Sequence, residues 1–473
     1  MCSKAEFPLA AIRILWILVG VFLHALTAGA QPTNYSLIYD FSLGVTNRGG
    51  FYYVRQLMEG RDHRLYGATV AGGAYSRGTV FSMRLDGTDY HLLHSFQGNP
   101  SDGASPEAGL IQASDGKLYG TTIQGGVSNW GTMFRLSADG SAYTVLHHFT
   151  GGISDGAAPR ARLLESSDGR LYGTTYSGGT NGPGTVFAIN KDGSDFAIVR
   201  SLTASATDAG YPEGPLMEGS DGAFYGVAAS GGIVNSGALF KLERDGSYTV
   251  LHLYNDGADG AAPRDALLEG SNGQLYGTTR AGGTAGRGTI FRLNKNGTSY
   301  TVLHHFTGIY SEGASPDAAL IEGRDGLLYG STKSGGVYNS GTLFRIAKDG
   351  TGLAMLHHFT AGGDTGYYPQ DGLISGSDGA FYGTAPGGHG SFDAKTAFGF
   401  IFRLGHGLGL SVIGSEVHLE LTGIPGFNYE IQHSTDLSSW ITLEALVMPE
   451  SGRIDRQYPE ASGEPGFFKL HVP

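Results

Sequence analysis

Three sets of residues recur in this sequence with side chains that could bind a metal ion or a ligand. Imidazole groups lie in runs such as LHHF: His94, His147, His148, His252, His304, His305, His357 and His358. Carboxylates lead acid-Gly-Ala-x-Pro segments: Asp102, Asp155, Asp259 and Glu312. Short loops bounded by glycines carry residues that differ from copy to copy: Tyr75, Trp130, Asn181, Asn235, Arg287 and Tyr338. Imidazole and carboxylate are metal ligands, whereas exposed aromatic side chains suit the binding of a sugar or a protein.

These residues belong to a repeat. A Tyr-Gly pair returns at Tyr66, Tyr119, Tyr172, Tyr225, Tyr276, Tyr329 and Tyr382. Five of the six intervals are 53 residues and one is 51. A fixed period of this length indicates a repeat architecture.

One unit is predicted to contain four strands, which we call a, b, c and d: residues 109–113, 117–122, 132–136 and 143–149. Each is rich in β-branched and aromatic residues. Asp115-Gly116 joins a to b and Asp139-Gly140 joins c to d, and these pairs predict type I′ hairpin turns. The first unit has Asp62-His63 instead. Each unit is therefore a four-stranded antiparallel meander, the pattern of a β-propeller blade.

The ends of the array predict how the ring closes. Residues 35–41, YSLIYDF, align with strand d but precede the first strand a. Residues 398–404, FGFIFRL, form the last strand c, and no strand d follows. We expect an all-β, seven-bladed propeller over residues 35–404, in which the N-terminal strand d completes the seventh blade and removes an open edge.

The segments before and after the repeats differ from them in sequence. Residues 1–30 combine Lys4 and Arg13 with an apolar run and an Ala-Gly-Ala site, which predicts a cleaved secretory signal peptide. Residues 405–409 form an expected linker, and residues 410–473 a small β-sandwich-like C-terminal domain. The single cysteine, Cys2, lies in the signal peptide. We expect a secreted, periplasmic or extracellular protein without membrane insertion after signal cleavage.

Net charge is −12, and no basic run is present, so nucleic acid is not an expected partner. The chain has no P-loop, nucleophile elbow or zinc-ligand spacing, so we expect no cofactor and no metal. We expect a monomer.

Several motifs resemble a known family. They are LYGTT at 118–122 and 171–175, GGVYNSGTLFRI at 335–346 and DGAAPRA at 155–161. These are similar to the GloVer (Gloeo/Verruco) tandem repeats of secreted bacterial proteins, over about 370 residues. The C-terminal segment 423–440 resembles a small β domain common at the ends of such proteins. The resemblance implies a propeller-like fold and assigns no activity to any residue.

Successive turns and loops of a blade alternate between the two ends of the propeller, and this parity selects the end where a ligand would bind. The a–b and c–d turns share one end, and the b–c loops and d-to-a crossovers share the other. The six variable loop residues named above would then surround one mouth of the channel. The seventh b–c loop is longer and adds His389 and Asp393. Adjacent histidines in a strand point to opposite faces, so we expect the histidines to pack and the crossover acids to stabilise turns.

Three functions fit these features. The leading one is a secreted or cell-envelope binding protein whose ligand is a glycan or another protein. A second is an extracellular polysaccharide-active lyase or hydrolase, for which Asp393 and an acidic crossover residue are the nameable carboxylate pair. A third is a structural envelope module without a ligand.

Overall fold

The computed structural model describes residues 35–41, 54–255, 257–360, 366–386, 399–405, 407–413, 416–423, 428–434, 439, 441–448, 453–459 and 467–471. Every regular element in these ranges is a β-strand. Within the same ranges, no helix has the length and hydropathy needed to cross a lipid bilayer. The expected signal peptide, residues 1–30, lies outside them.

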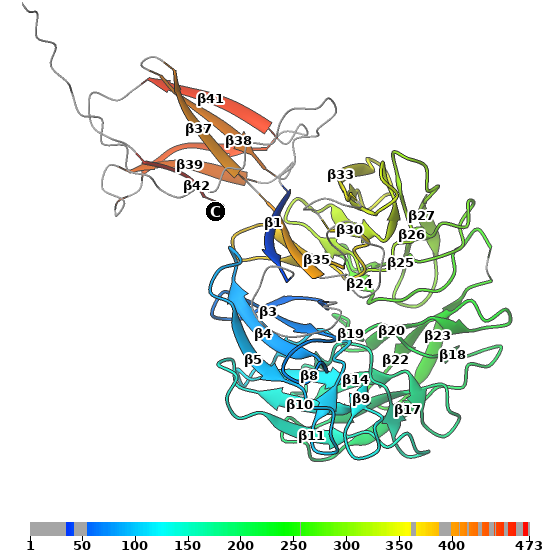
Figure 1. Ribbon diagram of the computed structural model, residues 1–473. Coiled ribbons are helices and arrows are strands. Elements are labelled where there is room, and N and C mark those ends of the chain that lie inside the picture. Colours follow the sequence, from blue (N-terminus) through cyan, green and yellow to red (C-terminus); the bar gives the residue numbers. More distant parts are fainter. Residues whose placement is uncertain are drawn as a thin grey trace, which may run out of the picture. The chain divides into compact units, whose positions relative to one another are not determined.

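Seven four-stranded antiparallel sheets are arranged around a common centre, as Figure 1 shows, so the molecule contains a seven-bladed propeller. The innermost strands a are β2 (Met58–Glu59), β7 (Ile111–Gln112), β13 (Leu164–Glu165), β19 (Met217–Glu218), β24 (Leu268–Glu269), β29 (Ile321–Glu322) and β34 (Ile374–Ser375). The strands b are β3 (Arg64–Thr69), β8 (Leu118–Thr122), β14 (Leu171–Thr175), β20 (Phe224–Ala228), β25 (Leu275–Thr279), β30 (Leu328–Thr332) and β35 (Phe381–Pro386).

The third strands, c, are β4 (Thr79–Arg84), β10 (Thr132–Leu136), β16 (Thr185–Ile189), β22 (Ala238–Leu242), β26 (Thr289–Leu293), β32 (Thr342–Ile346) and β36 (Gly399–Leu404). The outermost strands, d, are β5 (His91–Ser95), β11 (Thr144–His148), β17 (Ala197–Ser201), β23 (Tyr248–Leu253), β27 (Thr301–His305), β33 (Ala354–His358) and β1 (Tyr35–Asp40). We number the blades 1 to 7 in this order.

The ring closes as the sequence predicts. β1 pairs with β36 in antiparallel register, from Tyr35 opposite Leu404 to Asp40 opposite Phe400. The Tyr35 ring also stacks on His357 of blade 6, with ring centroids 3.9 Å apart and an interplanar angle of 5°. The N-terminal strand therefore completes blade 7 and contacts the blade before it.

Two local predictions are wrong. Strand a is only two residues long in each blade, and residues that precede it line the central cavity. The Asp-Gly turns are not type I′, because Gly116 and Gly140 have positive φ but Asp115 and Asp139 do not. The Gly116 amide donates to the Ala113 carbonyl, and the Ala113 amide to the Lys117 carbonyl. This pattern is a three-residue hairpin loop whose last residue is left-handed, a place that glycine fills at little cost.

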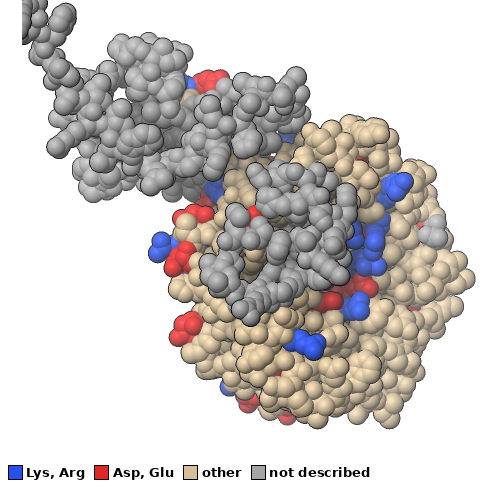
Figure 2. Space-filling view, in the orientation of Figure 1, with Lys and Arg blue, Asp and Glu red and all other residues tan. Residues whose placement is uncertain are grey.

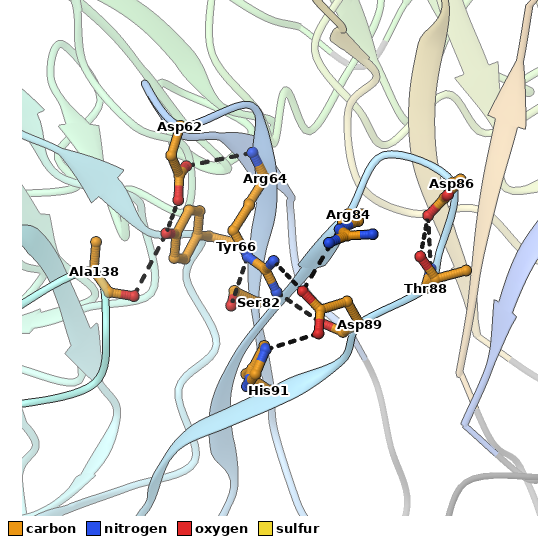
Figure 3. A network of polar contacts seen from close by, with 10 residues as sticks. All are labelled: Asp62, Arg64, Tyr66, Ser82, Arg84, Asp86, Thr88, Asp89, His91 and Ala138. Carbon is orange, nitrogen blue, oxygen red and sulfur yellow. Dashed lines mark hydrogen bonds and ion pairs between the residues drawn. The ribbon is translucent and has the colours of Figure 1, made fainter.

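The Tyr-Gly motif couples this turn to the core. The Tyr119 hydroxyl donates to Asp115 Oδ2 over 2.8 Å, and Figure 3 shows the equivalent Tyr66–Asp62 contact of blade 1. A side chain at Gly120 would place its Cβ 2.6 Å from Phe134 Cζ, so the glycine makes room for an aromatic ring of the next strand. The tyrosine of the motif thus stabilises the turn by a hydrogen bond, and the glycine allows the core to pack.

Neighbouring blades are linked at the end of the propeller that carries the a–b and c–d turns, which we call the turn end. Ser114 of blade 2 donates its amide to Glu165 Oε2 of blade 3 over 2.6 Å. The same type of bond runs from the Ser377 amide of blade 7 to Glu59 of blade 1 over 2.7 Å, across the closure. Carboxylates at this end therefore serve the structure of the ring.

The opposite end, the loop end, carries the b–c loops and the crossovers. In four places a short two-stranded pair joins a crossover to a b–c loop: β6 (Gly103–Ala104) with β9 (Gln124–Gly125), β12 (Gly156–Ala157) with β15 (Ser177–Gly178), β18 (Ala209–Gly210) with β21 (Ser230–Gly231), and β28 (Gly313–Ala314) with β31 (Ser334–Gly335). The predicted parity of turns and loops is therefore confirmed.

Two three-stranded sheets form the C-terminal β domain. One contains β37 (Gly407–Ile413), β38 (Glu416–Thr422) and β41 (Arg453–Pro459), and the other contains β39 (Asn428–Ser434), β40 (Ile441–Val447) and β42 (Phe467–His471). Leu419 and Leu421 of the first sheet share a buried cluster with Tyr429 and Ile431 of the second. β37 begins at Gly407, within the stretch expected to be a linker.

Candidate functional site: a charged pocket at the centre of the ring

A cavity of about 190 Å³ lies where the chain enters strand a of each blade. These entries follow the crossovers, so the cavity belongs to the loop end. Six of its lining residues directly follow the crossover prolines: Glu107, Arg160, Glu213, Arg264, Asp317 and Gln370. Arg55 lines it from blade 1. In Figure 2, basic and acidic side chains lie next to one another near the middle of this part of the molecule.

The charges on this wall alternate in sign around the ring. The guanidinium groups of Arg55 and Arg160 both lie 3.9 Å from the Oε2 atom of Glu107. Arg160 also lies 3.8 Å from Glu213, which in turn lies 3.0 Å from Arg264. Most of these separations are too long for hydrogen bonds, so the pairs attract one another without consuming their donors and acceptors.

The alternation ends at blade 7, where the residue after the crossover proline is the neutral Gln370 and the next residue is Asp371. Asp317 lies 3.5 Å from Arg280 and 3.9 Å from Lys333, whereas Asp371 lies 3.8 Å from Arg55. Burial raises the pKa of Asp371 to about 6, against the lowering effect of Arg55. Burial also raises the pKa of Asp317.

Two further charges line the cavity. Burial lowers the pKa of the Arg162 guanidinium, while the charge of Asp265 opposes that shift. Asp265 accepts hydrogen bonds from the amides of Ala266 and Ala319, each over 2.8 Å. Burial nevertheless raises the pKa of Asp265.

Among the residues that the structure describes, several buried polar atoms of the wall have no hydrogen-bond partner. They include the Nε atoms of Arg55, Arg160 and Arg264 and the Oδ1 atom of Asp317. Buried polar groups are usually satisfied, so these atoms are available to bind a ligand or water. The Arg160 guanidinium is held over the Tyr176 ring at 4.1 Å, which fixes its direction.

The variable loop residues lie on the same end but not in the cavity. Tyr75, Trp130 and Tyr338 are 55%, 49% and 58% exposed, and Asn181, Asn235 and Arg287 are exposed as well. They belong to six different blades, and none lines the cavity. The loops instead contact the outermost strands, since the Ala74 amide donates to Ser95 Oγ over 3.3 Å.

Two of these loop residues also have structural contacts. Asn235 has a φ of 57°, and its Oδ1 atom accepts a hydrogen bond from the Gly231 amide over 3.0 Å. The Trp130 ring lies against Gly151 of the following crossover, where an added Cβ would come within 3.2 Å of it. His389 and Asp393, predicted on the seventh loop, lie outside the described residues. A binding role for all eight residues stays a prediction.

The histidines pack as expected. In two of the three pairs the first histidine stacks on a ring of the next blade, as His147 does on Phe196 with centroids 4.0 Å apart. Its Nε2 atom lies 3.1 Å from Asp155 Oδ1. Asp155 also accepts hydrogen bonds from the amides of Thr150 and Gly156, over 2.9 and 2.7 Å, which confirms the predicted turn role for this acid. Asp102 and Glu312 likewise accept amide hydrogen bonds within their crossovers. Among the described residues, no group of three His, Cys, Asp or Glu side chains is placed to hold a metal ion.

Comparisons with known proteins agree with the repeat architecture. The chain matches the model of the Gloeobacter/Verrucomicrobia repeat over residues 53–269 and 246–413. No curated protein shows a significant match.

Solved propellers are similar in fold only. The periplasmic gluconolactonase of Pseudomonas aeruginosa is 14% identical with a TM-score of 0.46, and the alignment covers 84% of this chain and 99% of that one. A 6-phosphogluconolactonase homologue of Bacteroides uniformis is 14% identical with a TM-score of 0.45, covering 86% and 98%. An ulvan lyase, a polysaccharide lyase, is 9% identical with a TM-score of 0.40, covering 86% and 98%.

The repeat match spans most of the chain and all seven blades. The chain therefore belongs to the Gloeobacter/Verrucomicrobia repeat family.

Proposed function

We propose that this protein is a secreted or cell-envelope binding protein that takes one unit of a glycan into the central pocket from the loop end. The observation that carries the proposal is the wall of alternating guanidinium and carboxylate groups. Sugar hydroxyls both donate and accept hydrogen bonds, so they match a wall on which donors and acceptors alternate. The cavity is smaller than the ~300–1,000 Å³ pockets of drug-sized ligands, which suits a single sugar unit.

Exposed apolar side chains of the b–c loops and crossovers support the same end of the molecule. Ten of the eleven large apolar residues exposed on the described propeller lie on its b–c loops or crossovers: Tyr75, Val127, Trp130, Ile153, Ile233, Val234, Ile309, Tyr310, Val337 and Tyr338. Such concentrations mark interaction surfaces, and aromatic rings can cover the apolar face of a sugar. The rest of a glycan chain would lie across these loops.

A glycan array probed with the mature protein, followed by calorimetric titration of the strongest ligand, tests the proposal. Trp130→Ala and Tyr338→Ala should each weaken binding about tenfold or more, roughly 1.4 kcal/mol. Asp325→Ala is a matched control, because Asp325 accepts its hydrogen bond from Tyr329 at the turn end. Binding of a protein but no glycan would reject the ligand class, and no binding at all would favour the structural module.

A polysaccharide-active enzyme is the second candidate, and the pKa of Asp371 is the observation that favours it. A carboxyl whose pKa is raised to about 6 can act as a general acid, and Asp371 lies in the same pocket as other carboxylates. A screen for release of reducing ends or of unsaturated products from polysaccharides tests this function. Activity that Asp371→Asn abolishes would establish the enzyme, whereas glycan binding without turnover would leave the binding protein.

A further inference from the structure

Arg162 differs from every residue at the same place in the other blades. Three residues after the crossover proline, or at the matching place of blade 1, the other blades carry Gln56, Gly109, Pro215, Ala266, Ala319 and Gly372. None of these side chains is charged. The blade therefore folds with a small or neutral residue here, and the charge of Arg162 serves a purpose other than the fold of the blade.

Arg162 also differs from the other pocket arginines in its partners. Arg55, Arg160 and Arg264 each lie within 4 Å of a carboxylate. Within the described part of the chain, Arg162 has neither an ion pair nor a hydrogen bond. Its side chain is nevertheless partly buried and lines the cavity.

Asp265, the acid whose charge acts on Arg162, does not serve as a full ion-pair partner for it. Asp265 gives one carboxylate oxygen to the Ala266 amide and the other to the Ala319 amide. A partly buried cation with incomplete compensation is unfavourable, and it becomes favourable when an anion arrives. On the blade 3 side, the pocket therefore carries a positive charge that the chain does not fully compensate and that a negative group of a ligand can neutralise.

We propose that Arg162 binds the oxyanion of an acidic sugar unit, a carboxylate or a sulfate, when that unit occupies the pocket. The planar guanidinium presents paired N–H donors that match the two oxygens of such a group, whereas a lysine ammonium does not. The hydroxyls of the same sugar would meet Arg160, Glu107 and Glu213. This inference rests on the proposed function and adds the chemical class of the ligand.

Matched oligosaccharides test the inference: one set ends in a hexuronate, one in a sulfated hexose and one in the neutral hexose. Their affinities are measured by calorimetry with the wild-type chain, with Arg162→Gln and with Arg162→Lys. Arg162→Gln copies the residue that blade 1 uses at this place, so the fold should be retained, and thermal unfolding checks it. Arg84→Gln at the turn end is the control, because the Arg84 side chain is largely exposed and far in the blade from the crossover.

The wild-type chain should bind at least one acidic set about tenfold or more tightly than the neutral set. Arg162→Gln should abolish that preference while neutral binding stays unchanged, Arg162→Lys should keep part of it, and Arg84→Gln should keep all of it. Whether the hexuronate or the sulfated sugar binds identifies the oxyanion. Equal affinity for neutral and acidic sugars would overturn the inference and leave the proposed function standing. Failure of all three sets, together with an empty glycan array, would overturn both.

Discussion

The two ends of the propeller use the same types of charged residue in opposite ways. At the turn end, Asp115 binds Tyr119 and Glu165 binds Ser114, with bond lengths of 2.8 and 2.6 Å. At the centre of the loop end, Arg160 and its two acidic neighbours stand 3.8–3.9 Å apart. Carboxylates with short hydrogen bonds inside the chain maintain its structure, whereas charges kept apart remain able to bind a ligand. The difference teaches that a repeat can use one end for assembly and leave the other for recognition.

The largest expected effect concerns a crossover acid whose role is structural although it lies at the loop end. Asp155→Ala should lower the free energy of unfolding by roughly 2–4 kcal/mol, because it leaves the Thr150 and Gly156 amides without an acceptor. Urea unfolding measures the change. A loss below about 0.5 kcal/mol would mean that water replaces the carboxylate, and the crossovers would then be less rigid than we infer.

A pH-dependent effect should follow from Asp371. Its folded pKa of about 6 lies above the ~3.9 of an unfolded aspartate, so the native state holds the proton more tightly. The free energy of unfolding should therefore fall as pH rises from about 4 through about 6, by on the order of 2 kcal/mol from this group. Asp371→Asn should remove that part of the slope. Identical slopes for the two proteins between these pH values would contradict the raised pKa of Asp371 in the folded protein.

A smaller effect is expected at the turn end. Tyr119→Phe removes the hydroxyl that donates to Asp115, and it should lower the free energy of unfolding by about 1 kcal/mol. Glycan affinity should not change, because the bond lies at the end opposite the pocket. Weaker binding by a fully folded Tyr119→Phe protein would show that the two ends are coupled.

The smallest effect is expected at an exposed c–d turn. Asp139 accepts hydrogen bonds from the Ser141 amide and hydroxyl, over 2.9 and 2.7 Å, and solvent can replace both. Asp139→Ala should therefore shift the melting temperature less than Tyr119→Phe does. A larger shift in differential scanning calorimetry would assign this turn a role beyond its own geometry.

The sequence predicted the ring well because its information is local and repeated. The Tyr-Gly period, the extra strand at Tyr35 and the missing strand after Leu404 suffice to count blades and to close them. The turn type was wrong because both hairpin families place glycine at a left-handed position, and only the φ of the preceding aspartate separates them.

The pocket escaped prediction although its signal was present. Glu107, Arg160, Glu213, Arg264 and Asp317 follow successive crossover prolines and alternate in sign. Each residue is separated from the next by a whole blade, so no local window contains two of them. The variation between b–c loops predicts Trp130 and Tyr338 as ligand contacts, but both lie outside the cavity. Variation between repeats indicates a surface that tolerates substitution, and it does not locate the axis of the ring.

The central claim is that ligand recognition occurs at the loop end and that the turn end stabilises the ring, and blade 3 carries a residue at each end that can test it. Arg160 lines the pocket, whereas Asp168 accepts the Tyr172 hydroxyl over 2.8 Å at the turn end. Calorimetric titration of the strongest glycan should show about tenfold or greater weakening for Arg160→Gln. It should show no change for Asp168→Ala, provided that both variants remain folded. Weaker binding by Asp168→Ala together with unchanged binding by Arg160→Gln would contradict the claim.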